Sequence, residues 1–247
     1  MKKQHGFTLI EIMIALTLGL IVLGAVISIY VATVSSSSSI IKSARLNHDL
    51  NAVMALMIND IKRAGYWGGA TVAADSRANP FTATTTNLQI LTANDCILYS
   101  YDANGNGSVD TDEYYGFKLA AGTIQMRKTG ATTADCSNGT WEEFIDGAQL
   151  DITTLQFSFS AVSTPSLPAT SRCLNVTNSS LPSVASSSTL ICAANGTIFP
   201  IASQDNLAEK RLVNIQLAGR LDTDITTIKT LNRTLEVRNS RLYTQQP

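Results

Sequence analysis

One stretch of this 247-residue chain has the residue types and the spacing of a calcium-binding loop. Residues 102–113 match the pattern D-x-[DN]-x-[DN]-G-x5-E at every required position. Ca²⁺ takes about six to eight oxygen ligands, and oxygen-bearing side chains at alternating positions can supply them. Gly107 would allow the sharp turn that such a loop needs. The predicted ligands are Asp102, Asn104, Asn106, the carbonyl of Ser108, Asp110 through a water, and Glu113.

The flanks of this loop predict strands rather than the two helices of an EF-hand. Residues 97–101 before it and 114–117 after it are rich in Tyr, Ile, Leu and Phe, so we expect the loop to cap a hairpin. Calcium would then have a structural role. The alternative is an Asn- and Gly-rich hairpin tip with solvated carboxylates.

The four cysteines are an even number, which in an exported domain indicates disulfides. Three connectivities are possible, and we favour Cys96–Cys136 and Cys173–Cys192 because each closes a local loop. Each disulfide would stabilise the fold by roughly 3–4 kcal/mol, because it lowers the entropy of the unfolded chain. No CxxC spacing is present, which argues against a zinc or redox site.

Residue types that support catalysis or nucleic-acid binding are scarce. The chain has two histidines, His5 and His48, and no G-x-S-x-G nucleophile motif. Glu142 and Glu143 are adjacent, so on a strand their side chains would point apart. The net charge is −1, and no basic stripe is interleaved with aromatic residues. We expect neither an enzyme nor a nucleic-acid-binding protein.

An apolar segment near the N-terminus must hold these residues at a membrane. Residues 7–34 contain one side chain that is charged at neutral pH, Glu11, and would form about 42 Å of helix, more than a bilayer core requires. Lys2 and Lys3 precede it, which predicts a cytoplasmic N-terminus. A secretory signal peptide would have a shorter apolar region. A plain anchor leaves unexplained a carboxylate that costs up to about 3 kcal/mol if it is buried in lipid.

The sequence Gly6-Phe7-Thr8-Leu9-Ile10-Glu11 resembles the leader junction of type IV pilins and pseudopilins. The resemblance implies that prepilin peptidase cuts after Gly6 and methylates the amino group of Phe7. It also implies that the Glu11 carboxylate meets the Phe7 amino group of a neighbouring subunit in the filament. Two such charges about 4 Å apart attract by about 4 kcal/mol at an effective dielectric constant near 20. Unlike many major pilins, this segment contains no proline.

Beyond residue 34, an apolar pattern with steps of three and four residues extends from 40 to 61. We expect one helix of about 57 residues that crosses the serine run at 35–39 and ends near Gly65. We expect its methionines to fill the core. From residue 70 on, short alternating runs predict β-structure, with a tight turn at residues 120–122 and a long surface excursion over 163–203. The predicted strands are 88–91, 97–101, 114–119, 123–127, 154–161, 213–221 and 234–238.

A long helix on an antiparallel sheet is an α+β fold, and it is the architecture of pilins. The stretches at residues 63–68 and 237–239 resemble the PilW family of minor pilins, which is related to the J-type pseudopilins of type II secretion. The predicted organisation is a leader peptide (1–6), a transmembrane and assembly helix (7–34), its amphipathic continuation (35–65) and a periplasmic pilin domain (66–247).

The resemblance implies a minor pilin that takes part in initiation of type IV pilus assembly, at or near the tip. Implied partners are other minor pilins, the major pilin, the inner-membrane assembly platform, prepilin peptidase and a possible tip adhesin. The protein would lie in the inner membrane with a periplasmic C-terminal domain, and on the pilus after assembly. The alternatives are a J-type pseudopilin of type II secretion and a calcium-dependent adhesin.

Overall fold

A single long helix, α1 (Leu9–Ile61), forms the N-terminal part of the fold. The computed structural model describes residues 6–68, 76–91, 93–145, 150–159, 172–175 and 206–244. The 53 residues of α1 run without a break through the serine run at 35–39, as predicted. The helix ends earlier than expected, because residues 62–65 form turns and Gly65 has a φ of +74°. That left-handed conformation, which favours glycine, directs the chain out of the helix.

The chain divides within α1 into two compact units, Met1–Arg45 and Leu46–Pro247. The predicted boundary at 65/66 separates helix from sheet, but the compact unit begins inside the helix. The second unit takes in the last four to five turns of α1, because burial begins at Leu46.

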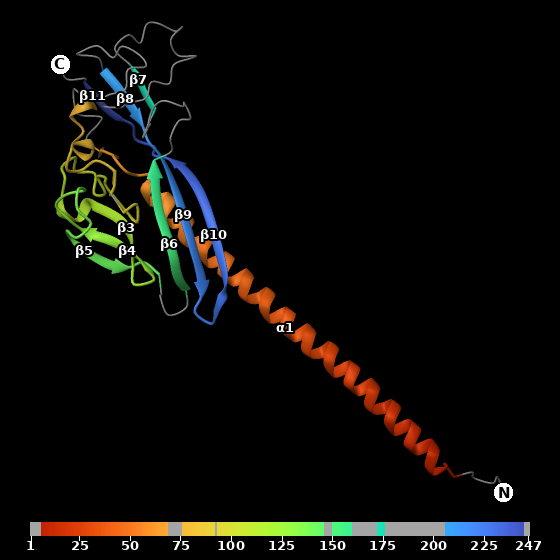
Figure 1. Cartoon of the computed structure of the whole chain (residues 1–247). Helices are drawn as coiled ribbons and strands as arrows, with labels where there is room; N and C mark the ends of the chain where they lie inside the picture. The colour runs from red at the N-terminus through yellow and green to blue at the C-terminus, as the bar shows by residue number, and fades with distance from the viewer. Residues whose placement is uncertain are drawn as a thin grey trace, which may run out of the picture. The chain divides into compact units, whose positions relative to one another are not determined.

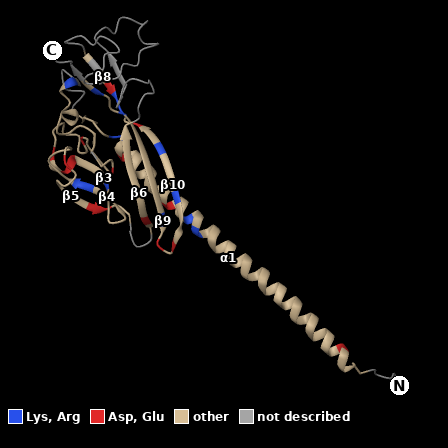
Figure 2. Cartoon of the chain, viewed as in Figure 1, with Lys and Arg blue, Asp and Glu red and all other residues tan. Residues whose placement is uncertain are grey.

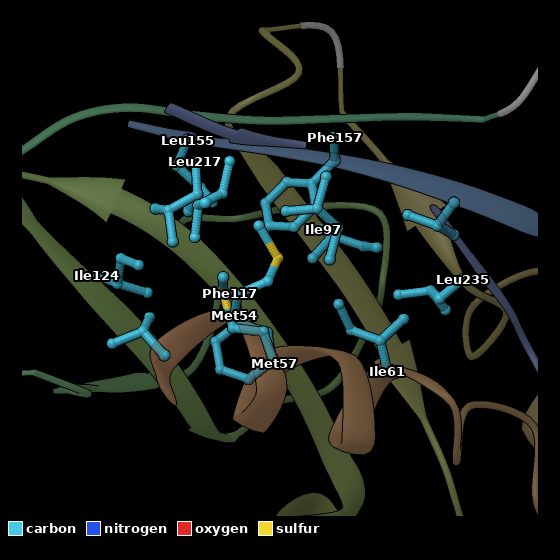
Figure 3. Packing of buried hydrophobic residues seen from close by; sticks show 14 of the residues in the cluster. Met54, Met57, Ile61, Ile97, Phe117, Ile124, Leu155, Phe157, Leu217 and Leu235 are labelled. Atoms are coloured by element: carbon cyan, nitrogen blue, oxygen red, sulfur yellow. The ribbon is translucent and has the colours of Figure 1, made fainter. Parts of the chain in front are cut away.

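The end of α1 supplies one side of the hydrophobic core. Its buried side chains recur at three- and four-residue steps, which places them on one face of the helix. Figure 3 shows Met54, Met57 and Ile61 packed among side chains of the strands. Met54 and Met57 are buried, which confirms that they fill the core. The helix contributes Leu46, Leu50, Val53, Met54, Met57 and Ile61.

In the described part of the second unit, three antiparallel sheets follow the helix (Figure 1). Sheet A has the order β1-β2-β3-β4-β5, sheet B the order β10-β9-β6, and sheet C the order β11-β8-β7. The strands of sheet A are β1 (Gln89–Ile90), β2 (Cys96–Ser100), β3 (Tyr114–Ala120), β4 (Thr123–Thr129) and β5 (Thr140–Glu143). Those of sheet B are β6 (Leu150–Phe159), β9 (Leu212–Leu221) and β10 (Asp224–Glu236). Those of sheet C are β7 (Arg172–Asn175), β8 (Asn206–Lys210) and β11 (Arg241–Thr244). The described residues also include three short 3₁₀ helices, η2 (Ser76–Ala78), η3 (Pro80–Thr82) and η4 (Thr111–Glu113).

Register and side-chain alternation explain how sheet B covers the helix. In β6 and β9, Leu155 faces Leu217 and Phe157 faces Ile215, and all four side chains are buried. The α+β prediction is confirmed, with one helix and antiparallel sheets.

The predicted tight turn joins β3 to β4. Ala121 (φ +50°) and Gly122 (φ +78°) both have left-handed backbones, as the two central residues of a type I′ hairpin require. A Cβ at Gly122 would lie 2.7 Å from Oδ1 of Asp151, so the position also needs glycine for space.

Several strands differ from the prediction. Strand β10 begins at Asp224, ten residues before the predicted start, and β6 begins at Leu150 rather than at 154. Strands β5, β8 and β11 were not predicted. Strand β7 lies inside the predicted surface excursion, whose remaining residues lie outside the described part of the chain.

Candidate functional site

The start of α1 is built as a capping box around Thr8 and Glu11. The Glu11 carboxylate accepts hydrogen bonds from the Thr8 N–H (3.0 Å) and from the Thr8 hydroxyl (2.9 Å). In return, the Glu11 N–H donates to Oγ1 of Thr8 at 3.4 Å. Such reciprocal bonds satisfy N–H groups that otherwise lack a partner in the first turn. This role of Thr8 was not predicted, although the T-x-x-E spacing is a direct signal for it.

The residues predicted for cleavage and methylation lie exposed just before this cap. Phe7 is 85 % exposed, and a Cβ built on Gly6 would have no neighbour within 4 Å. An exposed, non-helical peptide is what a processing enzyme needs to reach the bond between them. Cleavage after Gly6 and methylation of Phe7 stay predictions.

The helix that follows exposes apolar side chains on every side. By length and composition it qualifies as a membrane span, and none of its most apolar window is buried. A helix that is apolar all round requires an apolar environment outside the subunit. Figure 2 shows this part of α1 almost free of charge. Its acidic residue, Glu11, lies in the first turn of the helix. The N-terminal helix therefore fits a membrane anchor.

The acidic loop at residues 102–113 lies where the sequence placed it, at the tip of the hairpin formed by β2 and β3. Asp102 is buried, with 1 % of its surface exposed. Its Oδ1 accepts the N–H of Gly105 at 2.6 Å, and its Oδ2 accepts the N–H groups of Gly107 and Gly68, both at 2.9 Å. The flanking elements on the β2 and β3 sides are strands, as predicted.

Glu113, the last residue of the loop, is also buried (1 % exposed). Its Oε1 accepts the N–H of Ala103 at 2.8 Å, and its Oε2 accepts the N–H of Asp110 at 3.1 Å. The amide groups of Asn104 and Asn106 donate to Oδ2 of Asp110, at 3.0 and 2.8 Å. The loop is thus closed by hydrogen bonds from its own backbone and amides.

The predicted calcium ligands lie in one loop, held by the hydrogen bonds described above. Among the residues that the structure describes, no three His, Cys, Asp or Glu side chains gather where they could hold a metal ion. Asp102 and Glu113 each bury a carboxylate, and within the same residues no Lys or Arg forms an ion pair with either. Calcium binding stays a prediction.

The loop is joined to the segment that follows α1. The N–H of Asp102 donates to the carbonyl of Tyr66 at 3.0 Å, and Nε1 of Trp67 donates to the carbonyl of Gly107 at 3.0 Å. With the bond from Gly68, three successive residues after the helix contact the loop. A change in the conformation of the loop would therefore act on residues 66–68, the segment that follows α1.

A buried polar cluster fixes the end of α1 against sheet A. The carboxylate of Asp60 accepts hydrogen bonds from the hydroxyls of Tyr99 (2.5 Å) and Tyr101 (3.0 Å). Burial, and then the nearby Asp60 charge, raise the pKa of both phenols well above the usual value of 10.0. Arg63 lies over the Tyr101 ring at 4.0 Å. These contacts make the cluster structural.

One of the two predicted disulfides is confirmed. Cys96, at the start of β2, is bonded to Cys136 in the loop before β5. Buried Arg127 holds the same loop, because its guanidinium donates to the carbonyls of Thr129 (3.0 Å) and Thr132 (2.7 Å) and to Oδ1 of Asn138 (2.6 Å). The predicted Cys173–Cys192 bond lies outside the described residues.

The remaining candidates have ordinary surroundings. Glu142 and Glu143 are exposed on β5, an edge strand, and Glu142 lies 3.6 Å from Nζ of Lys128. His48 is also exposed, with its side chain 82 % accessible, and its Nδ1 lies 3.1 Å from the Asp49 carboxylate.

An exposed apolar helix that begins with a capped glutamate, followed by a domain of antiparallel sheets, defines a pilin-like protein. Comparison with known proteins agrees: residues 1–27 match the prokaryotic N-terminal methylation motif. Residues 39–237 match the family described as Prepilin peptidase-dependent protein B, and the chain belongs to that family.

A relative from Escherichia coli (strain K12), itself described as Prepilin peptidase-dependent protein B, is 24 % identical over 181 residues. The match covers 69 % of this chain and 89 % of the relative. No solved structure significantly matches the chain. The resemblance to pilin-like proteins is confirmed, and the assignment to PilW stays a prediction.

Proposed function

We propose that this protein is a minor pilin of the type IV pilus, processed by prepilin peptidase, that takes part in the initiation of pilus assembly. The observation that carries the proposal is the capped Glu11 at the head of a helix whose apolar face is exposed all round. A helix of this kind can be held first by a lipid bilayer and then by the helices of neighbouring subunits. The protein is then a structural subunit rather than an enzyme.

Cleavage after Gly6 would give Phe7 a new amino group, which is mostly protonated at neutral pH. The Glu11 carboxylate is the acidic group in the apolar segment, and it would meet that amino group on an adjacent subunit. Pairing would offset the burial of both charges in the filament and set the axial register. The partners would be other minor pilins, the major pilin and the inner-membrane assembly platform, with a possible adhesin at the tip.

The protein would first lie in the inner membrane with its N-terminus in the cytoplasm, and afterwards in the pilus. The alternative is a J-type pseudopilin of a type II secretion system, since the same helix and fold serve a short periplasmic filament. A calcium-dependent, pilus-associated adhesin is a further alternative, favoured only by the acidic loop.

Counting surface pili by electron microscopy tests the proposal. The gene is deleted in a strain that cannot retract its pili, so that failure to start is separated from failure to persist. Pili should be lost, or nearly lost, and should return with the wild-type gene but not with Glu11→Ala. Unchanged pili together with impaired type II secretion would favour the pseudopilin.

We also propose that the loop of residues 102–113 binds calcium to stabilise the hairpin tip. The support is its complete motif and its two buried carboxylates. At 100 times the dissociation constant, calcium would add about 2.7 kcal/mol, or roughly 5–10 °C in the unfolding midpoint. We expect the unfolding midpoint of the intact chain in detergent to fall by this amount when a chelator removes the calcium.

The matched variants are Asp110→Asn in the loop and Asp135→Asn outside it. Asp110→Asn should reduce the calcium-dependent shift, and Asp135→Asn should leave it unchanged. An identical midpoint with calcium and with chelator would refute calcium binding.

A further inference from the structure

Two Asn-Gly pairs, Asn104-Gly105 and Asn106-Gly107, follow each other in the loop of residues 102–113. An asparagine followed by glycine is especially prone to deamidation, because glycine has no side chain to hinder attack by its own backbone nitrogen. Both asparagines are exposed, so water can reach their amide groups. The two pairs are therefore the part of this loop most open to a spontaneous covalent change.

Deamidation uses the backbone nitrogen of the glycine as its nucleophile. This nitrogen loses its proton to solvent and forms a bond to Cγ of the preceding asparagine. The bond from Cγ to Nδ2 then breaks, and the amide nitrogen takes up a proton and leaves as ammonia. Water opens the cyclic succinimide at either of its carbonyls, which gives aspartate or isoaspartate. The reaction consumes water and releases ammonia, so its rate depends on how often the glycine nitrogen is free to attack.

A single carboxylate holds both of these nitrogens. The N–H of Gly105 donates to Oδ1 of Asp102 at 2.6 Å, and the N–H of Gly107 donates to Oδ2 at 2.9 Å. Asp102 is buried, so water screens its charge poorly where the two N–H groups meet it. The negative charge opposes loss of either amide proton, and the hydrogen bonds direct both nitrogens at the carboxylate. Asp102 thus occupies both nucleophiles.

The asparagine side chains form separate bonds. Oδ1 of Asn104 accepts the N–H of Asn106 at 2.8 Å, and Oδ1 of Asn106 accepts the N–H of Ser108 at 2.7 Å. Both Nδ2 groups donate to Oδ2 of Asp110, at 3.0 and 2.8 Å. Asp110 therefore holds the groups that leave, whereas Asp102 holds the nitrogens that attack.

Asp102 is itself fixed by the segment that follows α1. Its Oδ2 also accepts the N–H of Gly68 at 2.9 Å, and its own N–H donates to the carbonyl of Tyr66 at 3.0 Å. The space is tight, because a Cβ built on Gly68 would lie 2.9 Å from Oδ2 of Asp102 and 3.0 Å from Cα of Gly105. The position of the carboxylate therefore depends on residues outside the loop.

We propose that Asn104 and Asn106 are deamidation sites that the carboxylate of Asp102 keeps inactive in the folded chain. While the carboxylate holds both glycine nitrogens, reaction is limited to the small fraction of molecules in which the loop is open. If residues 66–68 separate from the loop, the carboxylate loses its anchor and both pairs become reactive. Each reaction then places a new negative charge beside Asp102. This inference goes beyond the functions proposed above.

Peptide mass spectrometry of the full-length chain in detergent tests the proposal. The chain is incubated with chelator in a mildly alkaline buffer, either folded or in urea. Deamidation at each asparagine is read from the mass increase and from the isoaspartate content of the digest. Asn104 and Asn106 should react at least about tenfold more slowly in the folded chain, because reaction waits for local opening. Equal rates in the folded and unfolded chains would overturn the proposal.

Two variants separate Asp102 from general order in the loop. Asp102→Ala should raise the rates at Asn104 and Asn106 at least about fivefold in the folded chain. The rate at Asn138, which precedes a glycine in another loop, should not change. Asp110→Asn is the matched control and should change the rates less than about twofold, because the glycine nitrogens remain held. Equal acceleration by both variants would contradict the role of Asp102.

A third variant covers the case in which Asp102→Ala unfolds the loop. Gly68→Ala leaves every loop residue in place but crowds the carboxylate, so it should raise both rates at least about threefold. Tryptophan fluorescence in urea shows whether each variant is folded. Folded Gly68→Ala with unchanged rates would show that the carboxylate does not control the reaction. None of these outcomes depends on pilus counts or on calcium, so the proposed function is tested separately.

Discussion

Asn239 shows how a single side chain holds a segment that lies far away in the sequence. Its Nδ2 donates to the carbonyls of Arg63 (3.1 Å) and Ala64 (3.2 Å), just after the end of α1. The N–H of Arg238 donates to the carbonyl of Lys62 at 3.2 Å. Turn bonds already satisfy the helical carbonyls of Ile58, Asp60 and Ile61. The bonds from residues 238 and 239 therefore hold the turns that follow the helix against the rest of the domain.

We expect Asn239→Ala to lower the free energy of unfolding by about 1–3 kcal/mol, because the Ala64 carbonyl loses this donor while the Arg63 carbonyl keeps the N–H of Tyr66. Asn232→Ala, at an exposed position of β10, is the matched control and should change stability by less than about 0.5 kcal/mol. Urea unfolding followed by tryptophan fluorescence measures both. Equal stability of the two variants would show that the carbonyls find water instead.

Two glycines with nearly the same φ allow the cost of a left-handed backbone to be measured separately from the cost of a steric clash. Gly105 and Gly122 have φ values of +76° and +78°, but only Gly122 has a neighbour, Oδ1 of Asp151, that an added Cβ would strike. We expect Gly105→Ala to cost about 1–2 kcal/mol from the left-handed backbone alone. Gly122→Ala should cost roughly 1–3 kcal/mol more. Unfolding in chelator gives both values, and equal losses would mean that Asp151 moves aside freely.

At the scale of elements, the contact of α1 with sheet A depends on neutral phenols. Because the pKa values of Tyr99 and Tyr101 are raised in the folded chain, the unfolded chain releases these protons first. Their contribution to stability is fully present below about pH 10, where the unfolded phenols titrate, and is lost as the pH rises further.

We therefore expect the unfolding free energy of the parent chain to fall between about pH 10 and 12. Tyr99→Phe should be less stable at neutral pH by about 1–2 kcal/mol, because Asp60 loses a donor. It should also lose less stability on going to high pH. Parallel pH profiles of parent and variant would show that Tyr99 does not govern the alkaline loss.

At the scale of the whole molecule, the first unit contributes little to the stability of the second. No described residue before Leu46 is buried, and the core cluster begins at that residue. We expect a chain lacking residues 1–39 to remain soluble without detergent and to unfold within a few degrees of the full-length protein. Differential scanning calorimetry measures this, and a markedly lower midpoint would mean that the apolar half of α1 supports the domain.

The sequence predicts the elements whose signals are local. The apolar run at residues 7–34 and the three- and four-residue steps beyond it predict α1, and the alternation of Leu155 and Phe157 predicts β6. The end of α1 was placed near Gly65, whereas the helix ends at Ile61 and residues 62–65 form turns that lead into the left-handed Gly65. Strands β5, β8 and β11 were missed because they are four or five residues long and lack a run of alternating apolar residues.

The candidate sites also divide into those with a local sequence signal and those that depend on contacts between distant residues. The loop of residues 102–113 and the pair Cys96–Cys136 were predicted from spacing along the chain. The hollow lined by Leu56 of α1, Phe117 of β3 and Phe144 after β5 was not predicted, because these side chains come together only in the folded unit. Burial of Asp102 was also hidden, since its partner Gly68 lies 34 residues before it.

The position of Asn239 also has a consequence for the order in which the protein can be made. A ribosome makes the chain from its N-terminus, so the turns that follow α1 exist well before Arg238 and Asn239 are added. The helix and its closing turns can therefore form early, whereas their bonds to residues 238 and 239 must form late. A ribosome that stalls before residue 238 would release a chain in which these turns lack that attachment.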